Sequence, residues 1–313
     1  MFMENILLSV IMPVYNAETW LDSTIQNILL QSYPYFELLI VDDGSKDASL
    51  DICMKYADMD NRVHVYHKQN GGVSSARNFA LDFVQGNYIV FCDSDDIPQK
   101  NWLLSFVEKI GKDIDLVVTG FVYKKKENET KYQINVNSKN PIDIAEGLSI
   151  DNTFGYMWNK CFRTKIINTN HIRFDENAIF LEDEHFICCY WRFVKKVAIS
   201  PLTEYVYNVP DFNLKYGIVD NYYIYVKMLQ NAKNYIPTSK QSEMLRKYSM
   251  GCFRCMLLPF QRHQYREAWN RLRDFVSYGS YFKNHNRYMR IITKWNYIVW
   301  FPLLIIYTAI KNK

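Results

Sequence analysis

The chain has 313 residues, of which 49% are hydrophobic and 22% are charged, and its formal net charge at pH 7 is +4. This length allows one large domain or two smaller ones, and so small a charge excess gives no reason to expect a nucleic-acid partner. Seven scattered cysteines, an odd number in a long chain, argue against a disulfide framework and favour a reducing compartment. Residues 2–12 lead straight into an apolar run, so we expect no signal peptide.

Strand and helix patterns alternate over the first 120 residues. Continuous apolar runs predict buried strands at residues 7–12, 36–41, 63–66, 88–92 and 116–119. The segments between these runs carry apolar side chains at helical spacing. This alternation predicts an α/β fold with a mostly parallel, doubly wound sheet. The polar segment 124–140 is expected to form a loop or a hairpin.

Polar loops follow four of the predicted strands. They contain Tyr15, the pair Asp42-Asp43, residues 70–74 and residues 93–96. In parallel sheets, ligands bind beyond the carboxyl ends of the strands. We therefore expect these loops to converge on one site.

The loop at residues 93–96 places three carboxylates, those of Asp93, Asp95 and Asp96, directly after a buried strand. Crowded like charges disfavour ionisation, and a cation relieves that repulsion. Carboxylates at i and i+2 suit Mg²⁺ or Mn²⁺, which often bind one or two protein carboxylates and complete their coordination with water and phosphates. The alternative is a solvated acidic turn that caps the following helix.

Two further loops have both a binding and a structural interpretation. Asp43 could accept hydrogen bonds from a base or a ribose, or residues 42–45 could form only a turn before a helix. Residues 70–78 place two glycines before a helix, whose N-terminus attracts anions. Arg77 lies near the start of that helix, and its alternative role is that of a solvated surface side chain. Neither G-x-G-x-x-G nor G-x-x-x-x-G-K-[ST] occurs, which argues against a dinucleotide oxidoreductase and a P-loop NTPase.

A second acidic cluster, Glu182-Asp183-Glu184, lies far downstream among apolar neighbours such as Phe180 and Phe186. Carboxylates in apolar surroundings tend to have raised pKa values, which suits a general base that works near neutral pH. The alternative is a helix N-terminus, where acidic side chains complement the helix dipole.

These segments, taken in order, resemble the motifs of inverting family 2 glycosyltransferases of the GT-A fold, of the bacterial cell-surface polysaccharide type. The matching stretches are residues 9–16, 41–45, 71–78 and 91–96, followed by Trp158-Asn159-Lys160 and Glu182-Asp183. The resemblance covers residues 6–210.

The resemblance implies a nucleoside-diphosphate sugar donor, most often UDP-linked, and a divalent metal, Mg²⁺ or Mn²⁺. The donor-binding positions that it implies are Pro13, Tyr15, Asp43, Arg77, Asp93 and Ser94. Within this set, Tyr15 and Asp43 would contact the uracil and Asp93 the ribose. Asp95 would ligate the metal on the diphosphate.

The resemblance also implies roles in the second half of the chain. Asp183 would be the general base that takes the proton from the acceptor hydroxyl. Trp158 would lie beside the donor sugar or the acceptor, and Lys160, Glu182 and Glu184 would lie in the same vicinity.

Residues 1–210 are predicted to form the GT-A domain, with residues 1–120 as its nucleotide-sugar half and residues 121–210 as its acceptor and catalytic-base half. Residues 211–313 are expected to form a helical C-terminal region that ends in an uncharged apolar segment, residues 295–310. That segment is shorter than the roughly 20 residues of a spanning helix and is flanked by basic side chains. We predict that it associates with the inner face of the bacterial plasma membrane, near a lipid-linked acceptor. A helix buried against the domain or in a homodimer is the alternative.

The predicted function is therefore transfer of a sugar to a glycan or lipid-linked glycan in surface polysaccharide synthesis, by a cytoplasmic enzyme peripheral to the membrane. One alternative is a sugar-phosphate nucleotidyltransferase, which would need a basic, glycine-rich loop where residues 13–16 stand. The other is a non-catalytic nucleotide-sugar-binding module. The presence of all the candidate carboxylates argues against the latter.

Overall fold

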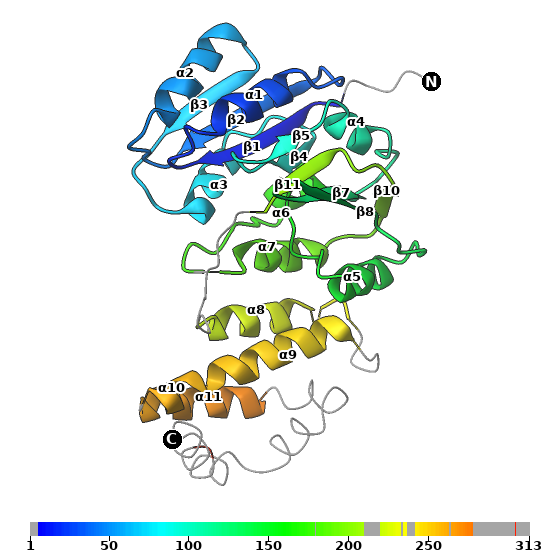
Figure 1. The fold of residues 1–313 in the computed structure, drawn as a ribbon. Helices are drawn as coiled ribbons and strands as arrows, with labels where there is room; N and C mark the ends of the chain where they lie inside the picture. Colours follow the sequence, from blue (N-terminus) through cyan, green and yellow to red (C-terminus); the bar gives the residue numbers. More distant parts are fainter. Residues whose placement is uncertain are drawn as a thin grey trace.

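The computed structural model describes residues 6–178, 180–209, 220–232, 234–236, 242–262, 264–277 and Leu304. Its α/β part lies at the top of Figure 1, and further helices are stacked below it in layers toward the C-terminal end of the chain.

Seven strands of the described residues form the main sheet, in the order β10-β6-β9-β4-β1-β2-β3. They are β1 (Leu8–Val14), β2 (Phe36–Asp42), β3 (Val63–His67), β4 (Tyr88–Phe91), β6 (Leu116–Thr119), β9 (Lys160–Arg163) and β10 (Val197–Ser200). Strand β9 runs antiparallel to both of its neighbours, β4 and β6, and the other pairs are parallel. The mostly parallel α/β sheet predicted from the sequence is thus confirmed, and each of the five predicted strands is present.

Helices cover both faces of this sheet because consecutive side chains of a strand point to opposite faces. Val10 and Met12 of β1 share an apolar cluster with residues of α1 (Leu21–Leu29), α2 (Ser49–Met59) and α4 (Trp102–Val107). Ile11 belongs instead to the cluster of α3 (Val73–Leu81) and α7 (Glu182–Trp191). The burial of both faces explains why these strands are continuously apolar.

A smaller sheet lies beside the main one, in the order β5-β11-β7-β8. Its strands are β5 (Ile97–Pro98), β7 (Phe121–Lys125), β8 (Asn128–Tyr132) and β11 (Tyr205–Asn208), and β7 and β8 form an antiparallel hairpin. The polar segment that begins at residue 124 therefore starts in a hairpin. Two helices, α5 (Pro141–Ile150) and α6 (Thr164–Thr169), complete this part of the chain.

The C-terminal helices extend the same core. They are α8 (Tyr222–Ala232), α9 (Glu243–Met256), α10 (Leu258–Gln261) and α11 (Tyr265–Ser277). Their buried apolar side chains belong to the same cluster as Phe186 of α7 and Phe91 of β4. In Figure 1, α8 and α9 lie below α7 and α5, and α10 and α11 lie below α9. The apolar packing is thus continuous from the sheet to α11.

All seven cysteines lie in the described part of the chain and are free thiols, six of them buried. Across the described residues, we find no helix with the length and apolar character needed to cross a bilayer. The predicted membrane-associating segment, residues 295–310, lies outside the described residues except for Leu304.

Candidate active site

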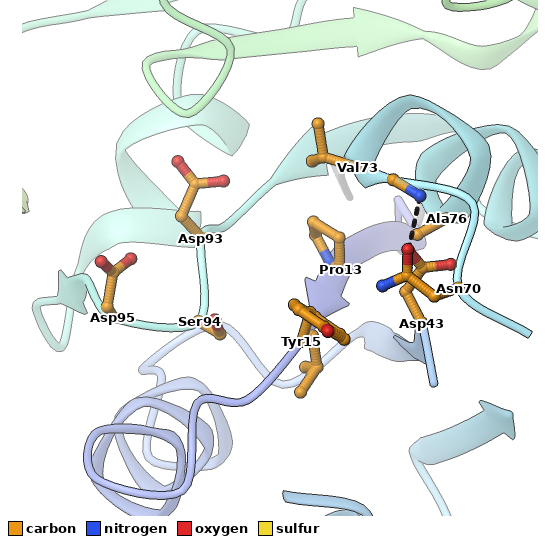
Figure 2. A pocket seen from close by; sticks show the side chains of 11 residues that line it. Pro13, Tyr15, Asp43, Asn70, Val73, Ala76, Asp93, Ser94 and Asp95 are labelled. Carbon is orange, nitrogen blue, oxygen red and sulfur yellow. Dashed lines mark hydrogen bonds between the residues drawn. The ribbon is translucent and has the colours of Figure 1, made fainter. Parts of the chain in front are cut away.

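The carboxyl ends of β1, β2 and β4 meet around a cavity of about 470 Å³, which we call the sheet-edge cavity. It is lined by Pro13, Val14, Tyr15, Asp43, Asn70, Gly72, Val73, Ala76, Asp93, Ser94 and Asp95. Figure 2 shows Asp93 and Asp95 on one side of the cavity and Asp43 with Asn70 on the other, with Pro13 and Tyr15 between them. The convergence of the four polar loops is therefore confirmed.

Asp43, directly after β2, holds the wall of the cavity in place. Its carboxylate accepts hydrogen bonds from the backbone N–H groups of Gly71 (3.0 and 3.1 Å) and Gly72 (2.7 Å) and from Lys68 Nζ (2.7 Å). Gly72 has a φ of +88°, a left-handed conformation that glycine adopts without steric cost. The Asp43 side chain is 3% exposed, so it shapes the loop before α3 in addition to any contact that it makes with a ligand.

The three carboxylates after β4 have different environments. Asp93 and Asp95 line the cavity, whereas Asp96 is 1% exposed and accepts hydrogen bonds from Tyr205 Oη (2.8 Å) and the Asn208 N–H (2.9 Å). Burial, with the charges of Asp93 and Asp95, raises the pKa of Asp96 well above the usual carboxyl range. Asp96 therefore anchors the loop to β11, which leaves two carboxylates for ligands.

Tyr205 and Asn208 also position the rest of this loop. Tyr205 Oη accepts a hydrogen bond from the Asp93 N–H (3.2 Å), and Asn208 Nδ2 donates to the Asp95 carbonyl (2.6 Å). Both residues belong to β11, which follows the acidic loop by more than one hundred residues in the sequence. No local pattern links β11 to residues 93–96, so sequence reasoning did not find these two supporting residues.

Arg77, on α3, joins the two acidic clusters. The guanidinium of this buried residue donates from Nη2 to Asp93 Oδ1 (3.1 Å) and from Nη1 to Asp183 Oδ1 (2.6 Å), and Nη1 lies 3.9 Å from Glu182 Oε1. It also lies over the Phe174 ring, 5.3 Å from the ring centre. Burial lowers the pKa of Arg77, but the three carboxylates more than offset it, and the net shift is upward. The alternative of a solvated surface arginine is wrong.

Asp183 lies in the first turn of α7, close to the cavity. The residue that precedes the helix, Leu181, has a left-handed backbone (φ +70°), a strained conformation of the kind found near functional sites. Burial raises the pKa of Asp183 to about 7, with Arg77 opposing the shift and Glu182 and Asp93 adding to it. A carboxyl group that titrates near neutral pH is suited to accept a proton.

The remaining predicted site residues lie away from the cavity wall. Trp158 is 4% exposed and stacks on Tyr205, with ring centres 4.9 Å apart. The Lys160 amine is fully buried and donates to the carbonyls of Thr153 (3.1 Å) and Tyr156 (2.7 Å) and to Asn159 Oδ1 (2.9 Å). Burial lowers the pKa of Lys160 to about 7. These two side chains thus support the loops around the site.

Glu184, the third acid of the second cluster, is also directed away from the cavity. It accepts hydrogen bonds from Lys247 Nζ and Tyr248 Oη of α9. The three consecutive acids therefore have different surroundings, because successive residues of a helix point about 100° apart.

The surroundings of Asp95 are those expected of a carboxylate that binds a metal ion. Within the described residues, no side chain donates a hydrogen bond to the Asp95 carboxylate, which is exposed to solvent. Among those same residues, no group of three or more histidine, cysteine or acidic side chains could hold a metal. Two carboxylates, those of Asp93 and Asp95, line the cavity, which suits an ion that takes one or two protein carboxylates and obtains its other ligands from water and phosphate.

The chain is similar in sequence to several curated proteins of Bacillus subtilis, among them EpsJ and GgaB. The uncharacterized glycosyltransferase EpsJ is 31% identical over 209 residues, which cover 64% of this chain and 60% of EpsJ. The minor teichoic acid biosynthesis protein GgaB of the same organism is 33% identical over 209 residues, which cover 64% of this chain and 23% of GgaB. The match therefore spans less than two thirds of either relative.

The crystal structure of S. aureus TarS 1-349 in complex with UDP-GlcNAc has a TM-score of 0.65 and 20% identity, and the match covers 91% of this chain and 83% of that one. At this identity the likeness shows a shared fold. Glycosyl transferase family 2 matches residues 9–199, which is more than half of the chain. With the mostly parallel sheet and the two acidic clusters at its carboxyl edge, this match shows that the chain belongs to glycosyl transferase family 2.

Proposed function

We propose that this protein transfers a sugar from a nucleoside-diphosphate sugar, with a UDP-linked donor as the leading choice, to a hydroxyl of a glycan or lipid-linked glycan acceptor. The donor occupies the sheet-edge cavity, and the reaction belongs to surface polysaccharide synthesis. The complex of TarS with UDP-GlcNAc and the role of GgaB in teichoic acid biosynthesis support this choice.

The observation that carries the proposal is the position of Arg77. One buried guanidinium contacts Asp93 in the cavity and Asp183 on α7. Asp93, which is assigned to donor binding, and Asp183, which is assigned to proton transfer, thus contact the same arginine side chain. A displacement reaction requires this proximity between the donor and the base.

The chemistry is a single displacement at the anomeric carbon. The acceptor oxygen forms a bond to that carbon as the bond to the diphosphate oxygen breaks, and the configuration inverts. Asp183 accepts the hydroxyl proton, and the nucleoside diphosphate leaves with the bonding electron pair. Arg77 orients Asp183 through the 2.6 Å hydrogen bond.

On the donor side, Tyr15 presents an aromatic face that is 49% exposed for stacking on the base. Pro13, Asp43 and Ser94 line the cavity beside it, and Asp93, which also lines the cavity, would contact the ribose. Asp95, with Asp93 beside it, would hold a Mg²⁺ or Mn²⁺ ion, which supplies charge stabilisation to the leaving diphosphate.

The test is the release of nucleoside diphosphate from a panel of sugar nucleotides, with and without a chelator. We expect one donor to be preferred, with activity lost in chelator and restored by Mg²⁺ or Mn²⁺. Asp95→Ala should abolish transfer, and Asp58→Ala, a change of an exposed aspartate near the end of α2, should have no effect. Equal activity with and without chelator would contradict the role of Asp95.

The membrane association belongs to the same proposal. We infer from the sequence that residues 295–310 bind the inner leaflet, which would bring a soluble donor and a lipid-linked acceptor together. Cell fractionation without detergent, on a chain that ends at Arg290, tests this inference. Unchanged membrane association would overturn it, and a change from dimer to monomer would support the alternative of a subunit contact.

A further inference from the structure

The first turn of α7 is held from two directions by consecutive residues. Asp183 accepts a hydrogen bond from Arg77 on the cavity side. The Glu184 carboxylate accepts from Lys247 Nζ (2.9 Å to Oε1 and 3.1 Å to Oε2) and from Tyr248 Oη (3.0 Å). Together the two contacts fix the rotation of this turn about the helix axis.

The contact between Glu184 and α9 is buried, so its loss should disturb the local structure. The Glu184 side chain is 6% exposed and Tyr248 is fully buried. A β-carbon placed on Gly155 would lie 3.3 Å from the Glu184 β-carbon, so the stem of Glu184 packs closely against residue 155. Removing the partners of a buried carboxylate leaves its charge uncompensated, which is strongly destabilising. Because Glu184 directly follows Asp183 in the same turn, that cost falls on the turn that carries Asp183.

Helix α9 is itself well anchored at this end. Its capping residue Ser242 accepts a hydrogen bond from the Leu245 N–H (3.0 Å), and Ser242 Oγ donates to buried Glu146 of α5. The Glu243 N–H donates to the same carboxylate (2.9 Å). Lys247 and Tyr248 follow within the next turn of α9, and this helix lies in the layer below α7 (Figure 1).

We propose that Lys247 and Tyr248 are positioning residues for the general base, acting through Glu184 on the turn that holds Asp183. This inference rests on the proposed function and deepens it. The two residues come from beyond residue 199, where the match to the family ends. The C-terminal helices would thus be part of the catalytic apparatus, although they contribute nothing to the cavity wall within the described residues.

The test compares Lys247→Met, Tyr248→Phe and the double variant with the wild-type chain. A displacement of about 1 Å at a reacting group can cost about 100-fold in rate, so we expect kcat of the double variant to fall between about 10- and 100-fold. The KM for the donor should change less than about twofold, because neither Lys247 nor Tyr248 is among the residues that line the sheet-edge cavity. The acid limb of the pH–rate profile should also move, which a loss of stability alone would not cause.

Arg246→Ala is the matched control. It removes a positive charge from the same helix, but Arg246 is exposed and pairs with Glu243 in its own helix. We expect its kcat to be unchanged. Lys247→Arg keeps the charge and should restore most of the activity.

Two outcomes separate the hypotheses. A folded double variant with kcat and a pH profile within about twofold of wild type would overturn the positioning role. A wild-type chain that transfers no sugar from any donor would instead overturn the proposed function. If the double variant fails to fold, Tyr248→Phe, which loses only a hydroxyl group, carries the same comparison, because the Lys247 contact remains.

Discussion

At the scale of single residues, the site depends on side chains that have different partners despite being neighbours in sequence. Asp93 and Asp95 line the cavity, whereas the Asp96 carboxylate is hydrogen-bonded to β11. In the same way, Asp183 accepts a hydrogen bond from Arg77, whereas Glu184 accepts one from Lys247 of α9. An acidic run in a sequence is therefore not one ligand-binding unit.

Asp183→Asn should reduce kcat by about 10²- to 10⁴-fold, since that is the usual contribution of a general base. The amide keeps the shape of the side chain and can still accept from Arg77, so donor binding should be retained. Transfer assays and calorimetric titration with UDP check the two expectations. Asp82→Asn, at an exposed residue, is the control, and full transfer activity in Asp183→Asn would rule out its role as the base.

The pH dependence follows from the same group. Because the pKa of Asp183 is raised to about 7, the base is protonated and inactive below that pH, and kcat/KM should rise as the pH increases through about 7. Arg77 holds the pKa down, so Arg77→Met should move this limb to higher pH. An acid limb near pH 4, the ordinary carboxyl range, would contradict the assignment.

At the scale of elements, the turn that leads into β4 leaves no space for a side chain at residue 86. A β-carbon on Gly86 would lie 2.5 Å from Ser9 Oγ and 2.6 Å from the Ser9 backbone nitrogen. The Gly86 N–H donates to Ser9 Oγ (2.9 Å), and Ser9 donates to buried Glu37. This packing fixes the start of the strand that carries the acidic loop at its other end.

Gly86→Ala should therefore lower the free energy of unfolding by about 1–3 kcal/mol, the usual cost of overpacking. Gly111→Ala is the matched control, because a β-carbon there meets nothing within 4 Å and its φ is not in the left-handed region. It should stay within about 0.5 kcal/mol of wild type. Chemical denaturation measures both, and equal stability of the two variants would contradict the packing argument.

The elements also show how much of the fold and of the site could be predicted from the sequence. The apolar periods of β1, β2 and β4 predict the strands, and their parallel pairing brings Tyr15, Asp43 and Asp93 together. The supporting contacts could not be predicted, because Tyr205 and Lys247 act across more than sixty residues of chain and carry no local signal. The burial of Lys160 was missed for the same reason, since only tertiary packing distinguishes it from a surface lysine.

At the scale of the whole molecule, the family domain and the C-terminal helices share one apolar cluster. The sequence predicts a domain boundary near residue 210. Helix α7 lies between the sheet and α9 (Figure 1), and it contacts α8 and α9, which follow that boundary in the chain. Removing α8–α11 would expose apolar faces, at about 1.5–3 kcal/mol for each large side chain uncovered.

A chain that ends at residue 209 should therefore aggregate, or bind a dye specific for exposed apolar surface, to a greater extent than the full-length chain does. Size-exclusion chromatography and thermal melts distinguish them. A cooperative melt from the shorter chain at the temperature of the longer one would show that residues 1–209 fold independently.

The buried thiols supply built-in reporters of local opening. Cys92 adjoins the acidic loop, Cys188 lies on α7 and Cys252 on α9, and burial raises the pKa of each. Alkylation requires an accessible thiolate, so each cysteine reacts only when its own layer opens. Mass-spectrometric mapping of labelling over time should then rank the layers by their opening free energies, and protection of Cys92 by UDP would report donor occupancy in a chain that carries no added probe.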